Sequence, residues 1–230
     1  AIKENPFEEM EPRQAIHLAS VYNIPMDHMG NLLNGKGLNP QLVNYWFVIH
    51  PPCLYLGMVI FSIPFAFGMA ALITGELGSY WVRVTRRWTM VAWLFLTCGI
   101  ILGGLWAYRQ LGWGGYWAWD PVENASFLPW CAATAFLHSI MIQERRDMLK
   151  RWNVFLLIFA FFLTIEATYM TRSGEIASVH SFGENATIGN SFRYFKWAIL
   201  GSGFFLLFYR FRELKGSHQL DSLLSREAAF

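Results

Sequence analysis

Residues 88–107 read WTMVAWLFLTCGIILGGLWA, a run of twenty residues that contains no charged side chain. About 20 apolar residues in a helix are enough to cross the roughly 30 Å hydrocarbon layer of a bilayer. Four further apolar runs lie on either side of it, at 45–74, 121–143, 152–171 and 195–211. The sequence therefore predicts an all-α integral membrane protein with about five transmembrane helices.

The composition of the whole chain agrees with this class. Of the 230 residues 54% are apolar and only 15% are charged, and the mean hydropathy is +0.29. A net charge of +2 is too small to indicate nucleic-acid binding, and the basic residues cluster beside apolar runs, where lipid headgroups are expected. Three cysteines, Cys53, Cys98 and Cys131, lie in apolar runs and form no CxxC pair, which predicts buried thiols rather than a disulfide framework or a zinc site.

The basic residues also predict an orientation. The connection at 75–87 carries Arg83, Arg86 and Arg87, that at 144–151 carries Arg145, Arg146, Lys150 and Arg151, and that at 172–194 carries only Arg172 and Arg193. The positive-inside rule places the first two connections on the inner side of the membrane. We therefore expect an outer soluble lead-in at 1–44, a five-helix membrane domain at 45–211 and an inner-side basic tail at 212–230.

The lead-in is acidic, with three Lys/Arg against five Asp/Glu, and it lacks the basic-then-apolar pattern of a signal peptide. An outer N-terminus without a signal needs an upstream segment to carry it across the membrane. We expect the chain to be a segment of a larger protein or one subunit of a split one. The alternative is a complete protein that inserts without a signal.

The predicted outer connection between the second and third helices is rich in aromatic residues. It reads Gly112-Trp-Gly-Gly-Tyr-Trp-Ala-Trp-Asp-Pro-Val-Glu-Asn124. Gly114 and Gly115 allow close backbone approach or a positive φ, so the loop could fold its rings into a flat surface against a large planar ligand such as a porphyrin. The alternative is an ordinary aromatic belt at the membrane interface. The large rings are Trp113, Tyr116, Trp117 and Trp119.

The end of this segment predicts the start of a helix. Asp120 suits the N-cap, Pro121 suits the first helical position, and Glu123 stands where a capping-box carboxylate bonds back to the cap. Helix starters are therefore favoured over acid/base catalysts for Asp120 and Glu123. They would fix the aromatic loop rigidly to the third helix.

Three of the six histidines occupy notable positions. His50 precedes Pro51-Pro52 at the outer end of the first helix, and His180 lies in the outer 172–194 connection, so the two imidazoles could be axial ligands of one haem iron or simply surface histidines. His138 lies about 26 Å down the third helix from Pro121. An ionisable residue at that depth is a candidate ligand of a buried haem, or a hydrogen-bond partner of a neighbouring helix.

The sequence leaves open the roles of three charged residues near the outer helix ends. Arg109 and Arg172 could bind haem propionates, since guanidinium pairs bidentately with carboxylates, or could be interface anchors. Glu166 could be a snorkelling carboxylate, a partner of Arg172 or a proton-handling group.

The chain resembles a known family of membrane proteins. The run Trp113-Gly-Gly-Tyr-Trp-Ala-Trp-Asp-Pro-Val-Glu-Asn-Ala-Ser126 is similar to the WWD signature of haem-handling membrane proteins, in the form typical of CcmF/NrfE-type cytochrome c haem lyases. His50-Pro51-Pro52, Thr171-Arg-Ser-Gly174 and Ser178-Val-His180 reinforce it. The resemblance runs from about Asn5 onward but covers only the central part of such a lyase. The shorter CcmC and CcsA types lack the Pro-Val-Glu-Asn-Ala-Ser continuation and rank second.

The resemblance implies roles for individual residues. His50 and His180 match the outer haem ligands, and His138 matches a ligand of a haem b inside the membrane, whose second ligand comes from a later helix. The platform itself would comprise Trp113, Gly114, Gly115, Tyr116, Trp117, Trp119 and Asp120. The chain departs from the family pattern at Tyr116, where a tryptophan is usual, and at Glu166, where an apolar residue is expected.

The resemblance also implies an activity and partners. The chain would belong to a holocytochrome c synthase that positions haem for thioether attachment to the CxxCH segment of an apocytochrome c. Expected partners are the remaining part of the lyase, a CcmE-like haem chaperone and a CcmH-like thiol-handling protein. The expected location is the bacterial inner membrane with the platform on the periplasmic side, and the mitochondrial inner membrane is the alternative. Other functions left open are a haem-transfer module without lyase activity and a structural subunit of an assembly complex.

Overall fold

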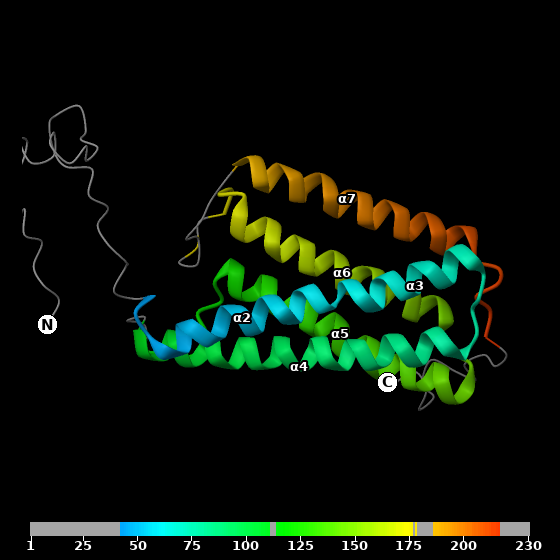
Figure 1. The fold of residues 1–230 in the computed structure, drawn as a ribbon, viewed down its shortest axis with the longest axis horizontal. Coiled ribbons are helices and arrows are strands. Elements are labelled where there is room, and N and C mark those ends of the chain that lie inside the picture. The colour runs from blue at the N-terminus through cyan, green and yellow to red at the C-terminus, as the bar shows by residue number, and fades with distance from the viewer. Residues whose placement is uncertain (1–41, 111–113, 177, 179–185, 217–230) are drawn as a thin grey trace, which may run out of the picture. The chain divides into compact units, whose positions relative to one another are not determined.

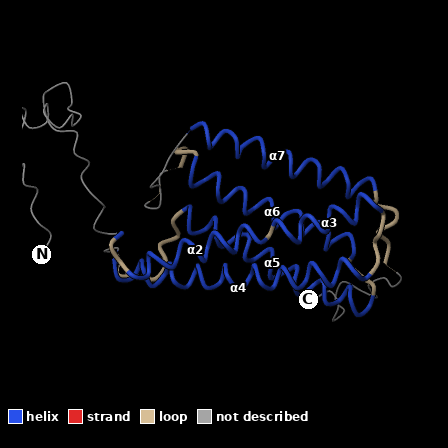
Figure 2. The backbone as a smooth tube through the Cα atoms, in the orientation of Figure 1, coloured by secondary structure: helices blue, strands red, loops and turns tan. Residues whose placement is uncertain are grey.

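A computed structural model describes residues 42–110, 114–176, 178 and 186–216. The chain divides into two compact units, Ala1–Val43 and Asn44–Phe230, and the elements below belong to the second unit. The regular structure of the described residues is helical and contains no strand (Figure 2). The predicted all-α class is therefore confirmed.

Six helices follow one another along the described part of the second unit (Figure 1). They are α2 (Tyr45–Ile60), α3 (Ser62–Thr74), α4 (Ser79–Gln110), α5 (Pro121–Arg146), α6 (Lys150–Arg172) and α7 (Ala186–Tyr209).

Four described segments are long and apolar enough to cross a membrane: Tyr45–Thr74, Ser79–Gln110, Pro121–Arg146 and Lys150–Arg172. The predicted fifth span, 195–211, corresponds to α7, which is not among these four. Its 24 residues include Arg193 and Lys196, which interrupt its apolar character. The all-helical membrane character of the chain is thus established, while the fifth crossing stays a prediction.

The first span is broken into α2 and α3 at Phe61. Pro64 has no N–H to donate to the carbonyl of Ile60 four residues earlier, and its ring crowds that carbonyl, which is a common cause of a helix break. The side chain of Ser62 donates instead to the Val59 carbonyl at 2.7 Å. Phe61 itself is buried, so the break lies within the packed interior.

Close approach of backbones holds α2 against α4. An added Cβ at Gly57 would lie 2.6 Å from the Leu96 nitrogen, and one at Gly99 would lie 2.7 Å from the Leu54 Cα. Gly99 and Gly103 form a GxxxG spacing, which permits such close helix packing in membranes. The two helices can therefore approach within a distance that any side chain at these positions would prevent.

The core of this unit forms where α3, α4, α5 and α6 meet, around Phe61, Leu96, Phe136 and Ile158. Asn153 is a fully buried polar residue within it, and its Nδ2 donates to Gln143 Oε1 at 2.7 Å. Such a pair satisfies groups that would otherwise be costly to bury in an apolar interior.

The three cysteines are free, as expected, but the prediction of buried thiols was wrong for two of them. Cys98 of α4 and Cys131 of α5 are exposed on the helix surfaces, and Cys53 is half-buried. The physical reason is that a membrane helix is apolar on every side, so an apolar sequence context does not indicate which face points inward.

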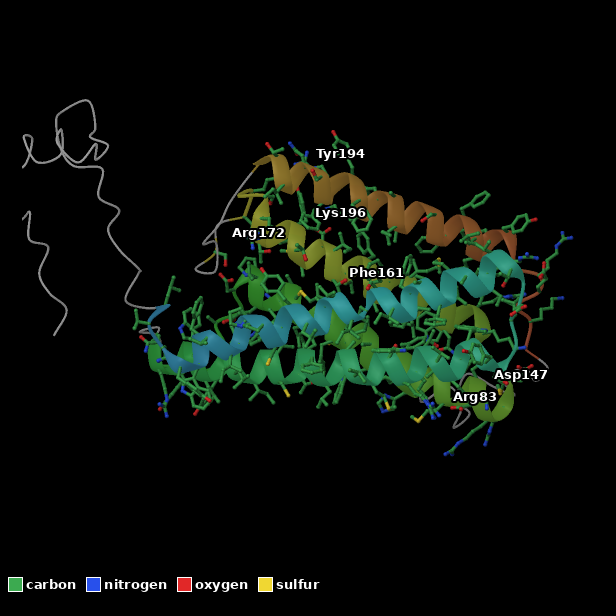
Figure 3. All side chains as sticks on the ribbon, viewed as in Figure 1. Arg83, Asp147, Phe161, Arg172, Tyr194 and Lys196 are labelled. Atoms are coloured by element: carbon green, nitrogen blue, oxygen red, sulfur yellow. The ribbon has the colours of Figure 1, made fainter. Side chains whose placement is uncertain are left out.

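The helix ends separate into two groups. Arg83 and Asp147, from the two basic connections, lie at one end, and Arg172 lies at the other (Figure 3). Arg210, beyond α7, joins the first group by donating from Nε to the Leu72 carbonyl at 3.0 Å and from Nη2 to the Ile73 carbonyl at 3.2 Å. This grouping is what the positive-inside rule requires, and the orientation relative to a membrane stays a prediction.

Candidate functional site

The predicted helix start after the aromatic loop (residues 112–120) is confirmed. Asp120 is the N-cap of α5, Pro121 is its first residue, and Glu123 completes a capping box. Asp120 Oδ2 accepts from the Val122 amide at 3.0 Å, and Glu123 Oε2 accepts from the Ala118 amide at 2.9 Å and from the Asp120 amide at 3.2 Å. Glu123 is buried, so this carboxylate fixes the end of the loop to the top of α5.

The loop backbone adopts left-handed conformations at two positions. Gly114 has φ 70°, which glycine adopts without strain, but Trp119 has φ 58°, which is unfavourable for a bulky residue. Asn124 Nδ2 donates to the Trp119 carbonyl at 3.0 Å and supports this conformation. Beneath the loop, a Cβ at Gly104 would lie 3.1 Å from the Tyr116 carbonyl oxygen, so α4 leaves room for the loop to rest on it.

The aromatic side chains of the loop differ in direction. Tyr116 stacks on Tyr108 of α4 with ring centroids 4.6 Å apart and an interplanar angle of 11°. Trp117 and Trp119 are perpendicular, at 87° with centroids 6.2 Å apart. The expectation of one flat surface therefore does not hold for these two rings. Tyr116 and Trp119 are 57% and 72% exposed, which leaves both available to a ligand.

His50 is held in a cradle formed by α4. Its Nδ1 lies 2.7 Å from the Gly99 carbonyl oxygen, and an added Cβ at Gly103 would lie 2.6 Å from its Cε1. Because a carbonyl can only accept a hydrogen bond, Nδ1 carries the proton, and Nε2 is then the nitrogen with a lone pair. Metal-binding histidines commonly have this arrangement, in which a backbone carbonyl fixes the tautomer and the ring direction.

A small cavity of about 40 Å³ connects this histidine with the loop. That volume holds about one water molecule, so a large ligand would have to lie over this region rather than inside it. His50 and the aromatic loop, far apart in sequence, therefore lie side by side around this cavity. Its lining includes His50, Gly103, Gly104, Tyr116, Trp117 and Glu123.

A column of aromatic rings continues from the loop along α5 and α4, which the sequence did not predict. Trp117 contacts Phe127 at 5.9 Å, Phe127 stacks on Trp130 at 5.6 Å, and Trp130 stacks on Trp93 at 5.7 Å between centroids. Trp93 Nε1 donates to Thr134 Oγ1 at 2.8 Å. The spacing of Phe127, Trp130 and Thr134 along one helix face was the signal that could have revealed the α5 part of this column.

His138 lies one turn beyond the end of that column. Its Nδ1 is 2.8 Å from the Thr134 carbonyl oxygen, so the imidazole is fixed by a backbone carbonyl as His50 is. The His138 side chain is exposed at the surface of α5. His50 is the only other histidine among the described residues, and it lines the cavity beside the aromatic loop.

The two candidate arginines lie at the helix ends nearest the loop. Arg109, in the last turn of α4, places its guanidinium carbon 5.6 Å from the centroid of the Trp46 ring, a cation–π contact. Arg172 is the last residue of α6 (Figure 3).

The connection between α6 and α7 (residues 173–185) is anchored at two described points. Ser178 Oγ donates to Asp120 Oδ2 at 2.5 Å. Glu175 contacts both the Tyr169 hydroxyl of α6 and the Arg193 guanidinium of α7, and Arg193 Nη2 donates to the Tyr169 hydroxyl at 3.1 Å. Trp113 and His180, two of the predicted site residues, lie outside the described residues.

Glu166 forms an ion pair within the helices. Its Oε2 lies 2.7 Å from Lys196 Nζ of α7, and that ammonium also lies 3.8 Å from the centroid of the Tyr169 ring. Lys196 is only 7% exposed and is directed between α7 and α6 (Figure 3). The partner of Glu166 is therefore a lysine that the sequence had left unassigned, which accounts for a charged residue at a position where an apolar one was expected.

Comparison with known proteins gives consistent matches. A family model described as "Cytochrome C assembly protein" matches residues 15–177. The CcmF cytochrome c-type biogenesis protein of Haemophilus influenzae is 46% identical over 196 residues, and that of Escherichia coli is 44% identical over 196 residues; each match covers 85% of this chain and 30% of the relative. NrfE of Haemophilus influenzae is 44% identical over 155 residues, which cover 67% of this chain and 24% of NrfE.

A solved structure of the cytochrome c haem lyase CcmF is also similar. It has a TM-score of 0.66 and 34% sequence identity, and the match covers 96% of this chain and 34% of that one. The chain thus spans about a third of the length of the relatives that it matches.

Proposed function

Since this chain belongs to the cytochrome c assembly protein family, we propose that it is the haem-positioning part of a cytochrome c haem lyase. In this proposal, haem rests on the aromatic loop with its iron held by His50 and His180. The observation that carries the proposal is the cradle of His50, in which Gly99 fixes one ring nitrogen and Gly103 makes room for the ring. The proposed platform comprises Trp113, Gly114, Gly115, Tyr116, Trp117, Trp119 and Asp120.

The described residues fit a haem that lies over the loop. His50 has the tautomer that leaves Nε2 as the ligating nitrogen. The exposed rings of Tyr116 and Trp119 supply apolar contact area, and the cavity beside His50 is too small to enclose a porphyrin. Arg109 and Arg172, near the loop, are the proposed contacts for the propionates.

The chain's own contribution to the reaction is positioning. Haem supplies two vinyl groups, to which the cysteine thiols of a CxxCH segment add. The loop is capped onto α5 by Asp120 and Glu123 and would hold a porphyrin face in one direction. Holding reactants in a productive geometry lowers the barrier by several kcal/mol without a nucleophile from the protein.

A second haem, of the b type, is proposed at His138. The imidazole is fixed by the Thr134 carbonyl and is exposed at the surface of α5, where a ligand from a helix outside this chain could complete the iron coordination. The position inside a candidate membrane span agrees with a buried electron carrier.

The proposed partners follow from the same role. They are the remaining part of the lyase, a CcmE-like haem chaperone, a CcmH-like thiol-handling protein and the apocytochrome c itself. The proposed location is the bacterial inner membrane, with the aromatic loop on the periplasmic side, and the four apolar spans support a multi-pass protein.

A second candidate function is haem transfer without thioether formation, of the CcmC/CcsA kind. The open setting of Tyr116 and Trp119 favours it, since an exposed platform would also release haem readily. The two candidates differ in product, because only a lyase yields covalent holocytochrome.

The test is an absorption spectrum of the detergent-purified protein with its co-purifying partners, oxidised and then reduced by dithionite. We expect a bis-histidine spectrum that weakens in the His50→Ala/His180→Ala double variant and keeps a second component that His138→Ala removes. His218→Ala is the matched control and should leave the spectrum unchanged. If haem content survives the double variant and falls only in His138→Ala, the outer-ligand assignment is wrong.

A further inference from the structure

A polar cavity lies at the end of the helices that carries the two basic connections, away from the aromatic loop. Its volume is about 360 Å³, within the range of small-molecule sites, about 300–1,000 Å³. The start of α4, the end of α5 and the start of α6 enclose it. Asp147, one of its lining residues, marks this end in Figure 3. The proposed haem chemistry does not use this cavity.

Gln143 presents an unpartnered donor to the cavity. This residue is only 5% exposed, and its Oε1 accepts a hydrogen bond from Asn153 Nδ2 at 2.7 Å. Among the described residues, nothing accepts a hydrogen bond from its Nε2, and the side chain lines the cavity. A buried donor is costly unless a ligand or water accepts from it. Because Nε2 can only donate, the cavity calls for a ligand with acceptor atoms.

The charged side chains around the cavity favour an anion. Its carboxylates are both engaged by cations, since Glu144 Oε2 lies 2.7 Å from Arg86 Nη1. Asp147 Oδ1 likewise lies 2.7 Å from Lys150 Nζ. Arg145 also lines the cavity, is exposed and forms no ion pair within the described part of the chain. Its guanidinium is therefore a surplus positive charge, of the kind that binds phosphate through two parallel hydrogen bonds.

Two helix N-termini add to the positive potential. α4, of 32 residues, begins at Ser79, and α6, of 23 residues, begins at Lys150; both residues line the cavity. No side chain caps the first turn of α6. The N-terminus of a helix favours negative charge. The C-terminus of α5 opposes an anion here, but Arg145 and Arg146 in its last turn offset that effect.

We propose that this cavity binds the phosphate group of an anionic ligand, with Gln143 Nε2 and the Arg145 guanidinium as donors. A lipid headgroup is the favoured source of the phosphate. One candidate membrane span begins at Ser79 and another ends at Arg146, so the cavity lies where the headgroups of a bilayer would be. Basic pockets between membrane helices bind such anionic headgroups. The proposal goes beyond the haem site and does not depend on it.

The experiment measures how fast phenylglyoxal, an arginine-directed reagent, modifies Arg145 in the full, purified lyase. The protein is placed in nanodiscs of phosphatidylcholine alone, of phosphatidylcholine with phosphatidylglycerol, and of phosphatidylcholine with added inorganic phosphate. Peptide mass spectrometry follows each arginine separately. Arg83 is the internal control, because it is exposed at the same end of the helices but does not line the cavity (Figure 3).

We expect phosphatidylglycerol to slow the modification of Arg145 about tenfold relative to Arg83, the protection given by a ligand at about ten times its dissociation constant. Inorganic phosphate should protect Arg145 less, because it is not held at the membrane surface. Both effects are measured on the wild-type protein, so they do not depend on the folding of any variant.

Two variants test the buried amide. Gln143→Glu keeps an oxygen for Asn153 Nδ2 but replaces the donor by a negative charge that faces the cavity, so the protection of Arg145 should be lost. Gln110→Glu makes the same chemical change at the opposite end of α4 and should leave the protection unchanged.

The outcomes decide both the site and the source of the phosphate. Protection of Arg145 by phosphatidylglycerol but not by inorganic phosphate supports a lipid headgroup. Equal protection by inorganic phosphate would overturn the lipid as the source and support a soluble phosphate compound. Equal slowing at Arg145 and Arg83, or no slowing at Arg145, would overturn the cavity as a phosphate site. Protection that persists in Gln143→Glu would overturn Gln143 as the donor.

Discussion

At the scale of single residues, the candidate site depends on glycines, which have no side chain, as much as on residues with functional side chains. Gly99 offers a carbonyl to His50, Gly103 leaves space for its ring, and Gly104 leaves space for the loop backbone at Tyr116. The sequence indicated His50 by its place before two prolines. It did not indicate the glycines, because their partners lie 49 or more residues away in the case of His50 and on a separate loop in the case of Tyr116.

Gly103 provides a direct test of this cradle. In Gly103→Ala the new methyl group would lie 2.6 Å from His50 Cε1, so the ring or α2 must move. We expect the free energy of unfolding to fall by about 1–3 kcal/mol and the His50-dependent part of the haem spectrum to weaken. Thermal unfolding in detergent and the reduced absorption spectrum measure the two effects.

The matched control is Gly201→Ala in α7, where an added Cβ meets nothing within 4 Å. It should leave the spectrum unchanged and raise the free energy of unfolding by about 0.5–1 kcal/mol, the usual difference between alanine and glycine in a helix. A spectrum altered equally by both substitutions would contradict the cradle.

At the scale of elements, local patterns predicted more than distant pairings did. The start of α5 could be predicted because Asp120, Pro121 and Glu123 act within one turn and their roles follow from spacing alone. The pairing of Glu166 with Lys196 could not be predicted from the sequence, because it depends on which faces of α6 and α7 meet. For the same reason Ser178, 58 residues from Asp120, appeared only as part of a motif.

The Glu166–Lys196 pair gives the prediction for the α6–α7 interface. Glu166→Leu alone leaves a lysine that is only 7% exposed without its carboxylate, and we expect the free energy of unfolding to fall by about 3 kcal/mol. Combining it with Lys196→Met should recover most of that loss, because no buried charge then remains. Thermal unfolding in detergent measures both variants.

The control for this pair is Asp147→Asn, which weakens the bond to Lys150 at the edge of the structure, where the Asp147 side chain is 50% exposed. Exposed pairs contribute little, so the change should be below about 1 kcal/mol. A Glu166 variant that is no less stable than this control would show that the buried pair adds nothing to helix association.

At the scale of the whole molecule, four candidate spans and two groups of helix ends agree with the membrane class that composition alone indicated. The class could be predicted from composition because every helix that crosses a bilayer needs a similar length and a mostly apolar sequence. Composition could not decide the fifth crossing, because Arg193 and Lys196 lie in α7. Whether such charges are tolerated depends on partners, and Lys196 has one in Glu166.

Orientation is testable by labelling in intact cells. With the three native cysteines replaced by alanine, we expect a membrane-impermeant thiol reagent to label Ala118→Cys in the aromatic loop from outside. Gly78→Cys, in the basic connection before α4, should be labelled only after the membrane is permeabilised, as the positive-inside rule requires. Both positions are exposed. Labelling of Gly78→Cys in intact cells would reverse the predicted orientation.

The left-handed backbone of Trp119 allows folding and the proposed activity to be tested at a single position. An L-residue with a large side chain is disfavoured there by about 1–2 kcal/mol, and glycine would be free of that penalty. A saturation library at this codon, sorted for abundance in the membrane, should therefore enrich glycine and asparagine. The same library sorted for cytochrome maturation should return tryptophan. If the two selections enrich different residues, the indole of Trp119 has been retained for function although the backbone conformation at this position disfavours it.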